Sequence, residues 1–426
     1  MKKNILSIYT ATIGSNNLIA FLSALAGIML IFFSIGNLIG LIPFSSLNEL
    51  VVWDAGWYRS IVEDGYKYEP GKQCNIAFFP LFPFLWKYLH LSAIHISLLN
   101  GLFYFISLGL IGRFLDISNS DLSLYFFLPS VMFCFVPFSE SVFYLSSTIA
   151  LIGLYRNSIP ISLFGLFLCG LSRSISVVFI PIILFSQFPY IFRSHTRYVA
   201  VVRTFKYVLT MFLSIIVVAF IQFLYTNRWF DFFEVQRYWN KSWQFPVLPL
   251  TTWGFGRIGW LDGTAILVSL IAVMIACILL FQTWKKRLLN TADQSFLFST
   301  AYLSAAGLIA MFYGNTDETT SVLSINRYIF ATPFAGLFFA KLKEEEWPVL
   351  KGNTILFVFW ILGLFLFGIT SPYGDKLRGL IYLSAYFIFF YTAMVKKKFH
   401  FITVLFIHLV LFLFLFKNYL AGFWIG

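Results

Sequence analysis

The chain has little charge: only 11% of its 426 residues are Asp, Glu, Lys or Arg, whereas 59% are hydrophobic. A soluble domain carries about 25% charged residues, so this composition excludes an ordinary soluble protein. The mean hydropathy of +0.83 is as expected if most of the chain crosses a bilayer. The sequence therefore predicts an all-α integral membrane protein that forms one polytopic domain over residues 1–426.

Cysteine and metal-binding patterns are also scarce. The chain has four cysteines, three of them within apolar runs, so we expect neither a disulfide framework nor a CxxC site. His90 and His95 have no further histidine or carboxylate at ligand spacing, and no DxD pair occurs. We therefore predict no metal site and no obligatory cofactor, with a non-essential divalent cation as the alternative.

The net charge of +12 does not indicate a nucleic-acid partner, because the basic residues punctuate apolar runs instead of forming a stripe. If the N-terminus is cytoplasmic, the cytoplasmic segments hold 17 of the 30 basic residues but only six of the 18 acidic residues. This asymmetry follows the positive-inside rule. Together with a composition rich in Phe, Ile and Asn, it favours a multi-pass protein of a bacterial cytoplasmic membrane, with its N-terminus inside.

Because roughly 20 apolar residues cross a bilayer, the apolar runs predict about 11–13 transmembrane helices. They lie near 17–43, 97–112, 122–137, 138–155, 158–172, 173–189, 207–225, 262–284, 293–313, 326–341, 353–370, 379–395 and 400–417. Three segments between them are too long or too polar to be simple turns: 44–96, 226–261 and 314–326. All three are predicted to lie outside, and each mixes acids, basic residues and aromatics, so chemistry on the outer face would use these loops.

The first outer segment, 44–96, carries five of the 18 acidic residues in an otherwise apolar chain. Within it, Trp53, Trp57 and Ile61 recur every four residues and Gly65 follows as a stop signal, so we predict an interfacial amphipathic helix whose apolar face they form. Asp54 would lie at its N-terminus, where helix amides favour a carboxylate. Two interpretations stay open for Asp54: a helix cap, or a catalytic group.

The same segment carries a resemblance. WDAGWYRSIVEDGY followed by AFFPLFPFL resembles the signature of the PIG-V family of lipid-phosphate-sugar-dependent mannosyltransferases, which is W-D, an aromatic residue, I-A-x-x-G-Y and then A-F-F-P-x-x-P-L. Weaker matches follow in the family's order, up to about residue 340. PFSESVFYL resembles its P-x-S-E segment, GLSRSISVVFIPIIL its T-R-P-x-G stretch, FFEVQRYWNKSW its F-x-x-x-Q-x-x-W loop and SINRYIFATPF its late R-Y helix.

The resemblance implies a GT-C helical bundle, a polyprenyl- or dolichyl-phosphate sugar as donor, an acidic residue in the first outer loop, and inversion at the anomeric carbon. The chain departs from the family at Val52, where eukaryotic members usually carry Arg. Ser174 and Ile175 replace the Pro that follows the family's Arg, and EPGKQC is an insertion. These departures leave the sugar and the acceptor open.

Transfer from a lipid phosphate needs a base for the acceptor hydroxyl. Asp54 is the expected catalytic residue, since partial desolvation can raise the pKa of a carboxyl group at the membrane interface. Glu63 and Asp64 are alternatives that would otherwise be solvated loop charges.

The leaving phosphate needs a cation. Arg327, beside Tyr328, is the expected anchor because a guanidinium fork suits phosphate oxygens, although it could instead snorkel at the membrane boundary. Arg173 and Arg59 compete for this role, and Arg173 interrupts apolar sequence, where charges are costly and often functional.

Further residues are expected to contact sugar or acceptor. They are Trp53, Trp57, Tyr58, Glu63, Asp64, Glu140, Gln236 and Trp239. For Glu140 the alternative is helix capping, and for Gln236 and Trp239 it is loop packing.

The sequence thus predicts an inverting glycosyltransferase that moves a hexose, mannose by family analogy, to a lipid-linked or surface glycan on the extracytoplasmic face. Its partners would be a polyprenyl-phosphate sugar donor, that acceptor and membrane lipids. The alternatives are a flippase or transporter, which would place ionisable residues midway through broken helices, and a polymerase or ligase for lipid-linked sugars.

Overall fold

The computed structural model is almost entirely helical. It describes residues 2–42, 49–192, 197–239, 241–285, 293–313, 315–316, 319–344, 353–368, 374–396 and 398–425. In this part of the chain the strands are confined to one short antiparallel pair, β1 (Asn315–Thr316) and β2 (Thr320–Ser321). The predicted all-α class is confirmed.

Eight helices of the described segments are long and apolar enough to cross a membrane, or nine if one bent pair is a single span. They are α1 (Lys2–Leu38) over Asn17–Leu38, α4 (Ala93–Phe114), Ser174–Ile191, α9 (Arg197–Thr226), α11 (Phe255–Trp284), α12 (Gln294–Phe312), α17 (Gly374–Met394) over Leu377–Met394, and α18 (Phe401–Leu420). Two shorter apolar helices, α7 (Ile159–Ser172) and α16 (Asn353–Phe367), accompany them. The chain is a multi-pass membrane protein, but the predicted 11–13 regular spans exceed what these residues form.

Two of the predicted spans are interrupted. Over 122–137 the chain forms a π-helical turn, η3 (Leu122–Phe126), and a 3-10 segment, η4 (Pro129–Phe135), before turning by 107° into α6 (Glu140–Tyr155). The second, 326–341, divides into α13 (Ile325–Phe330) and α14 (Pro333–Glu344). Pro129 begins η4 and Pro333 begins α14. Each span is broken there because proline cannot take an interior helix position without losing a backbone hydrogen bond.

The break before α6 is held by a buried amide. Asn100 of α4 donates from Nδ2 to the carbonyls of Val136 and Phe138 at 2.7 and 2.9 Å. Its Oδ1 accepts from Ser141 Oγ at 2.6 Å. Buried carbonyls released by a helix break need such partners, so Asn100 fixes where α6 begins and where Glu140 lies.

Helices α6 and α7 pack with their backbones in close approach. A Cβ at Gly153 would lie 2.3 Å from the Ser162 amide nitrogen, and one at Gly165 would lie 2.3 Å from the Ala150 amide nitrogen. Small residues at helix interfaces are the usual basis of tight packing in membranes. This pair therefore forms a rigid support beside the break at Glu140.

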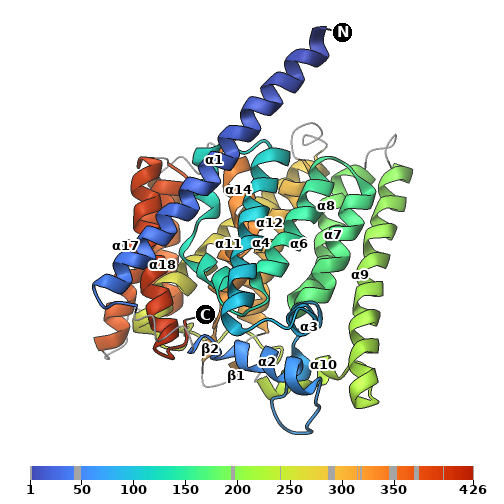
Figure 1. The fold of residues 1–426 in the computed structure, drawn as a ribbon, viewed down its shortest axis with the longest axis vertical. Coiled ribbons are helices and arrows are strands. Elements are labelled where there is room, and N and C mark those ends of the chain that lie inside the picture. The colour runs from blue at the N-terminus through green and yellow to red at the C-terminus, as the bar shows by residue number, and fades with distance from the viewer. Residues whose placement is uncertain are drawn as a thin grey trace.

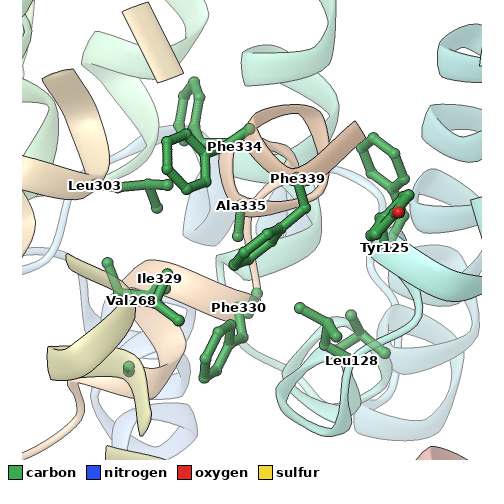
Figure 2. Packing of buried hydrophobic residues seen from close by; sticks show 14 of the residues in the cluster. Tyr125, Leu128, Val268, Leu303, Ile329, Phe330, Phe334, Ala335 and Phe339 are labelled. Carbon is green, nitrogen blue, oxygen red and sulfur yellow. The ribbon is translucent and has the colours of Figure 1, made fainter. Parts of the chain in front are cut away.

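The short helices α13 and α14 are anchored in the core. Ile329, Phe330 and Phe334 are buried among Val268 of α11 and Leu303 of α12, as Figure 2 shows. Closely packed side chains in a protein core do not shift gradually. Helix α13, which carries Arg327, therefore has a fixed position relative to α11 and α12.

The polar segments gather at one end of the helical body, opposite the end where the N-terminus projects (Figure 1). The first contributes α2 (Asp54–Asp64), η2 (Asn75–Ala77) and α3 (Leu81–Tyr88). The second contributes α10 (Asp231–Glu234) and η6 (Val235–Trp239), and the third contributes β1 and β2. The second segment is shorter than predicted, because α11 begins at Phe255 and not near residue 262.

Candidate active site

A cavity of about 840 Å³ lies where these polar segments meet. Its wall comes from all three of them, from the junction between α7 and the 3-10 segment η5 (Ser174–Val178), and from the C-terminal end of the chain. The lining residues are Trp53, Asp54, Trp57, Tyr58, Gln73, Ala77, Phe78, Phe79, Arg173, Ser174, Gln236, Trp239, Lys241, Thr251, Thr252, Trp253, Thr319, Ser321, Leu323, Ser324, Arg327, Tyr328 and Trp424.

Asp54 is the first residue of α2, and its carboxylate accepts from Arg327 Nη1 at 2.8 Å. The N-cap residue is Trp53, with φ 55°, and no side-chain cap bond is present there. The capping interpretation of Asp54 is therefore wrong: its carboxylate turns toward Arg327 and the cavity. With 16% of its side chain exposed, it is the most accessible acid of the charged cluster around Arg327.

Glu140 lies behind this pair and joins two arginines. Its Oε1 accepts from Arg327 Nε and Nη2 at 2.6 and 2.5 Å, and from Arg173 Nη1 at 2.5 Å. The side chain of Glu140 is 1% exposed, that of Arg327 4% and that of Arg173 8%. Two carboxylates thus balance two guanidinium groups, which is how charges withdrawn from water are stabilised.

Glu140 is absent from the cavity wall, and its buried carboxylate pairs with the two arginines instead of facing the cavity. Ser139, the N-cap residue of α6, makes no side-chain cap bond. Instead, the Ser139 hydroxyl accepts from Tyr58 Oη at 2.6 Å, which ties α2 to the start of α6.

Each member of the charged cluster comes from a helix start or break. Arg173 follows α7 in an extended conformation, with φ −151° and ψ 144°, and its guanidinium lies 4.9 Å from the centroid of the Tyr328 ring. Arg327 lies in the six-residue α13, packed over Phe133 and Phe138. Helix ends supply the room and the unpaired backbone groups that such polar side chains need.

A second buried network, which sequence reasoning missed, fixes α13. Asp262 of α11 accepts from the Asn326 amide N–H at 3.1 Å, from Asn326 Nδ2 at 2.7 Å and from Thr252 Oγ1 at 2.6 Å. Asn326 Oδ1 accepts from Ser130 Oγ at 2.9 Å. A lone acid in an apolar span is a recognised functional signal, so the sequence did offer a way to find Asp262.

The rest of the wall is largely aromatic. Trp57 lies edge-on to Trp239, with ring centroids 5.6 Å apart. Trp53 lies 5.6 Å from Trp253 and 4.9 Å from Trp424, centroid to centroid. Sequence reasoning identified Trp53, Trp57 and Trp239 but missed the other two, because only the fold brings residues 253 and 424 beside residue 53.

The predicted helix over 53–65 exists as α2, but the three residues predicted to form its apolar face do not share one environment. Ala55, Tyr58 and Ile61 are buried, whereas Trp53 and Trp57 line the cavity. Burial raises the pKa of Tyr58, so its hydroxyl stays protonated and available as a donor.

Three other predicted site residues lie away from the cavity wall. Arg59 Nε pairs with Glu63 at 2.7 Å, and Asp64 pairs with Lys67 at 2.7 Å. About half of each side chain is exposed. Roles for Arg59, Glu63 and Asp64 in catalysis or binding therefore have no geometric support here.

The cavity thus brings together Trp53, Asp54, Trp57, Tyr58, Arg173, Gln236, Trp239, Arg327 and Tyr328 of the predicted set. Among the described residues no group of three His, Cys, Asp or Glu side chains could hold a metal ion. No protein-family model matches the chain, and no match was found among curated proteins or solved structures.

Proposed function

We propose that the chain is a glycosyltransferase that takes a sugar from a lipid-phosphate donor and uses Asp54 as its base. One observation carries the proposal. Asp54 is a partly exposed carboxylate, held in place by Arg327, on the wall of a large cavity that is otherwise mainly aromatic, polar and cationic. The GT-C architecture and the mannosyltransferase resemblance belong to the same proposal.

The transfer would balance as follows. The acceptor hydroxyl oxygen attacks the anomeric carbon, and the bond from that carbon to the phosphate oxygen breaks. The electron pair of that bond leaves with the lipid phosphate, while the hydroxyl proton passes to Asp54. Attack from the face opposite the phosphate inverts the anomeric centre. A positioned general base of this kind contributes about 10²–10⁴-fold to a rate.

The ion pair with Arg327 gives Asp54 its orientation. Since Arg327 is itself held by Glu140, the Asp54 carboxylate has a fixed direction without being buried. Such positioning is the main requirement for a base, whose atom must come within hydrogen-bond reach of the proton it removes.

The aromatic wall suits a saccharide. The C–H faces of a sugar ring pack on aromatic rings, and Trp57, Trp239 and Trp253 present such surfaces around Asp54. Gln236, on the same wall, offers an amide that can both donate to and accept from sugar hydroxyls.

The proposal can be tested with protein reconstituted in liposomes and supplied with polyprenyl-phosphate mannose, labelled in the sugar, and extracted glycolipids. We expect the wild-type protein to move label to a new product and Asp54→Asn to do so at least about 100-fold more slowly. Glu69→Gln is the matched control, since Glu69 lies in the same polar segment but is exposed and paired with Lys72.

Two outcomes would contradict the proposal. Wild-type turnover by Asp54→Asn would remove Asp54 as the base. An intact donor that crosses the bilayer only when the wild-type protein is present would identify a transporter instead.

A further inference from the structure

A second, apolar pocket of about 320 Å³ adjoins the cavity. Its wall includes Val177 and Val178 of η5, Phe232 of α10, and Ala306 and Ile309 of α12. The two spaces share six lining residues: Ser174, Gln236, Lys241, Ser321, Leu323 and Tyr328. The cavity that holds Asp54 and the apolar pocket therefore meet along a common boundary.

Lys241 is the cation on this boundary. The positive charges deeper in the cavity, on Arg173 and Arg327, are balanced by Glu140 and Asp54. No carboxylate among the described residues forms an ion pair with Lys241, although its side chain is partly buried. Burial lowers the pKa of Lys241, and the nearby Tyr328 opposes that shift. A partly desolvated ammonium group without an acidic partner is stabilised when an anion binds beside it.

Exposed aromatic residues also belong to the wall of the apolar pocket. Phe233 and Trp243, which line it, are 51% and 74% exposed. Trp229 and Phe245 of the same polar segment are also exposed. Exposed aromatic rings beside membrane-spanning helices are typical of the bilayer interface, and α12 and Ser174–Ile191 both qualify as such helices. The pocket is therefore placed to receive a chain from the lipid phase.

We propose that Lys241 binds the phosphate of the lipid donor while the first isoprenoid units occupy the apolar pocket. The sugar would then project into the aromatic cavity toward Asp54. This inference rests on the proposed function and moves the role of phosphate anchor to Lys241 from Arg327 and Arg173, whose charges are already balanced. The anionic phosphate would meet the ammonium group of Lys241, and the apolar tail would meet the apolar pocket beside it.

Binding of sugar-free polyprenyl monophosphate to purified protein in zwitterionic nanodiscs tests the proposal without any turnover. We expect Lys241→Gln to weaken binding about tenfold or more, as for the loss of a charge-assisted contact, and Lys241→Arg to retain it. Lys72→Gln is the control, because Lys72 is exposed and paired with Glu69 outside the cavity. The uncharged alcohol polyprenol should bind the Lys241→Gln variant and the wild-type protein equally.

A second variant tests whether the apolar pocket holds the isoprenoid chain. Ala310 lines only the apolar pocket, and Ala310→Phe should weaken both polyprenyl phosphate and polyprenol. Inorganic phosphate should compete poorly with the lipid; equal competition would make the ligand a free phosphate and overturn the lipid assignment. Unchanged lipid binding by well-folded Lys241→Gln would overturn the proposal altogether.

The two proposals fail in different ways. If wild-type protein binds polyprenyl phosphate through Lys241 but transfers no sugar, the binding inference stands and the enzymatic one fails. If the protein transfers sugar and Lys241→Gln leaves the KM for donor unchanged, the enzymatic proposal stands and the anchor is elsewhere.

Discussion

Replacing Glu140 with Gln should destabilise the whole protein, because this buried carboxylate holds two arginines. The wild-type cluster contains Asp54, Glu140, Arg173 and Arg327, and its charges sum to zero. Glu140→Gln keeps the side-chain shape but leaves one uncompensated positive charge in a region where both guanidinium groups are less than one-tenth exposed. Breaking a buried ion pair by removing one partner costs about 3–5 kcal/mol.

A second substitution separates charge balance from shape. In Glu140→Gln combined with Arg173→Met, the remaining Asp54 and Arg327 again sum to zero, so part of the lost stability should return. By contrast, Arg173→Met alone should leave the cluster with a net negative charge and be less stable than the wild type. A favourable coupling between the two sites is what a shared network predicts for residues in contact.

Equilibrium unfolding in mixed micelles measures these differences, with Glu69→Gln as an exposed carboxylate control. We expect the control to change the free energy of unfolding by less than about 1 kcal/mol, as for surface ion pairs. A loss below about 1 kcal/mol for Glu140→Gln, or a double variant less stable than either single one, would refute the account of the cluster.

Three further predictions follow from single contacts. Asp262→Ala should lower the free energy of unfolding by about 1–3 kcal/mol for each buried donor left unpaired on Asn326 and Thr252. At a temperature where the variant is folded, it should also lower kcat, because Arg327 is displaced. Retained kcat would show that this network does not position the site. Gly165→Ala should cost about 1–3 kcal/mol by overpacking α6 against α7. In the same unfolding titration Gly27→Ala should not destabilise, because nothing lies within 4 Å of the added Cβ and alanine favours the helix. Equal losses would contradict the close packing of α6 and α7. Because its pKa is lowered, Lys241 should lose its charge at a lower pH than an ordinary lysine, so polyprenyl-phosphate affinity should fall as pH rises. Tyr313 and Tyr328 also line the pocket, whereas Arg173 and Arg327, which line the cavity, stay charged. A fall that persists in Lys241→Arg would therefore assign the pH dependence to the tyrosines.

Local sequence signals were sufficient for the helical membrane class and for the helix that carries Asp54. Hydrophobic run length and the four-residue spacing of Trp53, Trp57 and Ile61 depend only on neighbours in the chain. That spacing placed Trp53, Trp57 and Ile61 on one apolar face at the membrane interface, whereas in the structure Ile61 is buried in the protein and Trp53 and Trp57 line the cavity. Which side of an amphipathic helix is buried depends on what covers it.

The site itself depends on contacts that no local pattern contains. Asp54 and Arg327 are separated by most of the chain, and their ion pair requires the breaks before α6, after α7 and around α13. Asn100 and Asp262, which hold two of those elements, appear in the sequence as isolated polar residues in apolar runs. Run length alone treats such segments as straight spans, which explains both the excess of predicted helices and the missed positioning residues.

The claim that Asp54 is the base is tested most directly by a single-turnover experiment. Protein in excess is mixed with sugar-labelled polyprenyl-phosphate mannose, acceptor lipids are added, and the rate of label transfer is followed for wild type, Asp54→Asn and Glu69→Gln. We expect Asp54→Asn to bind the donor but to transfer label at least about 100-fold more slowly, while Glu69→Gln matches the wild type. Transfer by Asp54→Asn at the wild-type rate, with donor binding intact, would contradict it.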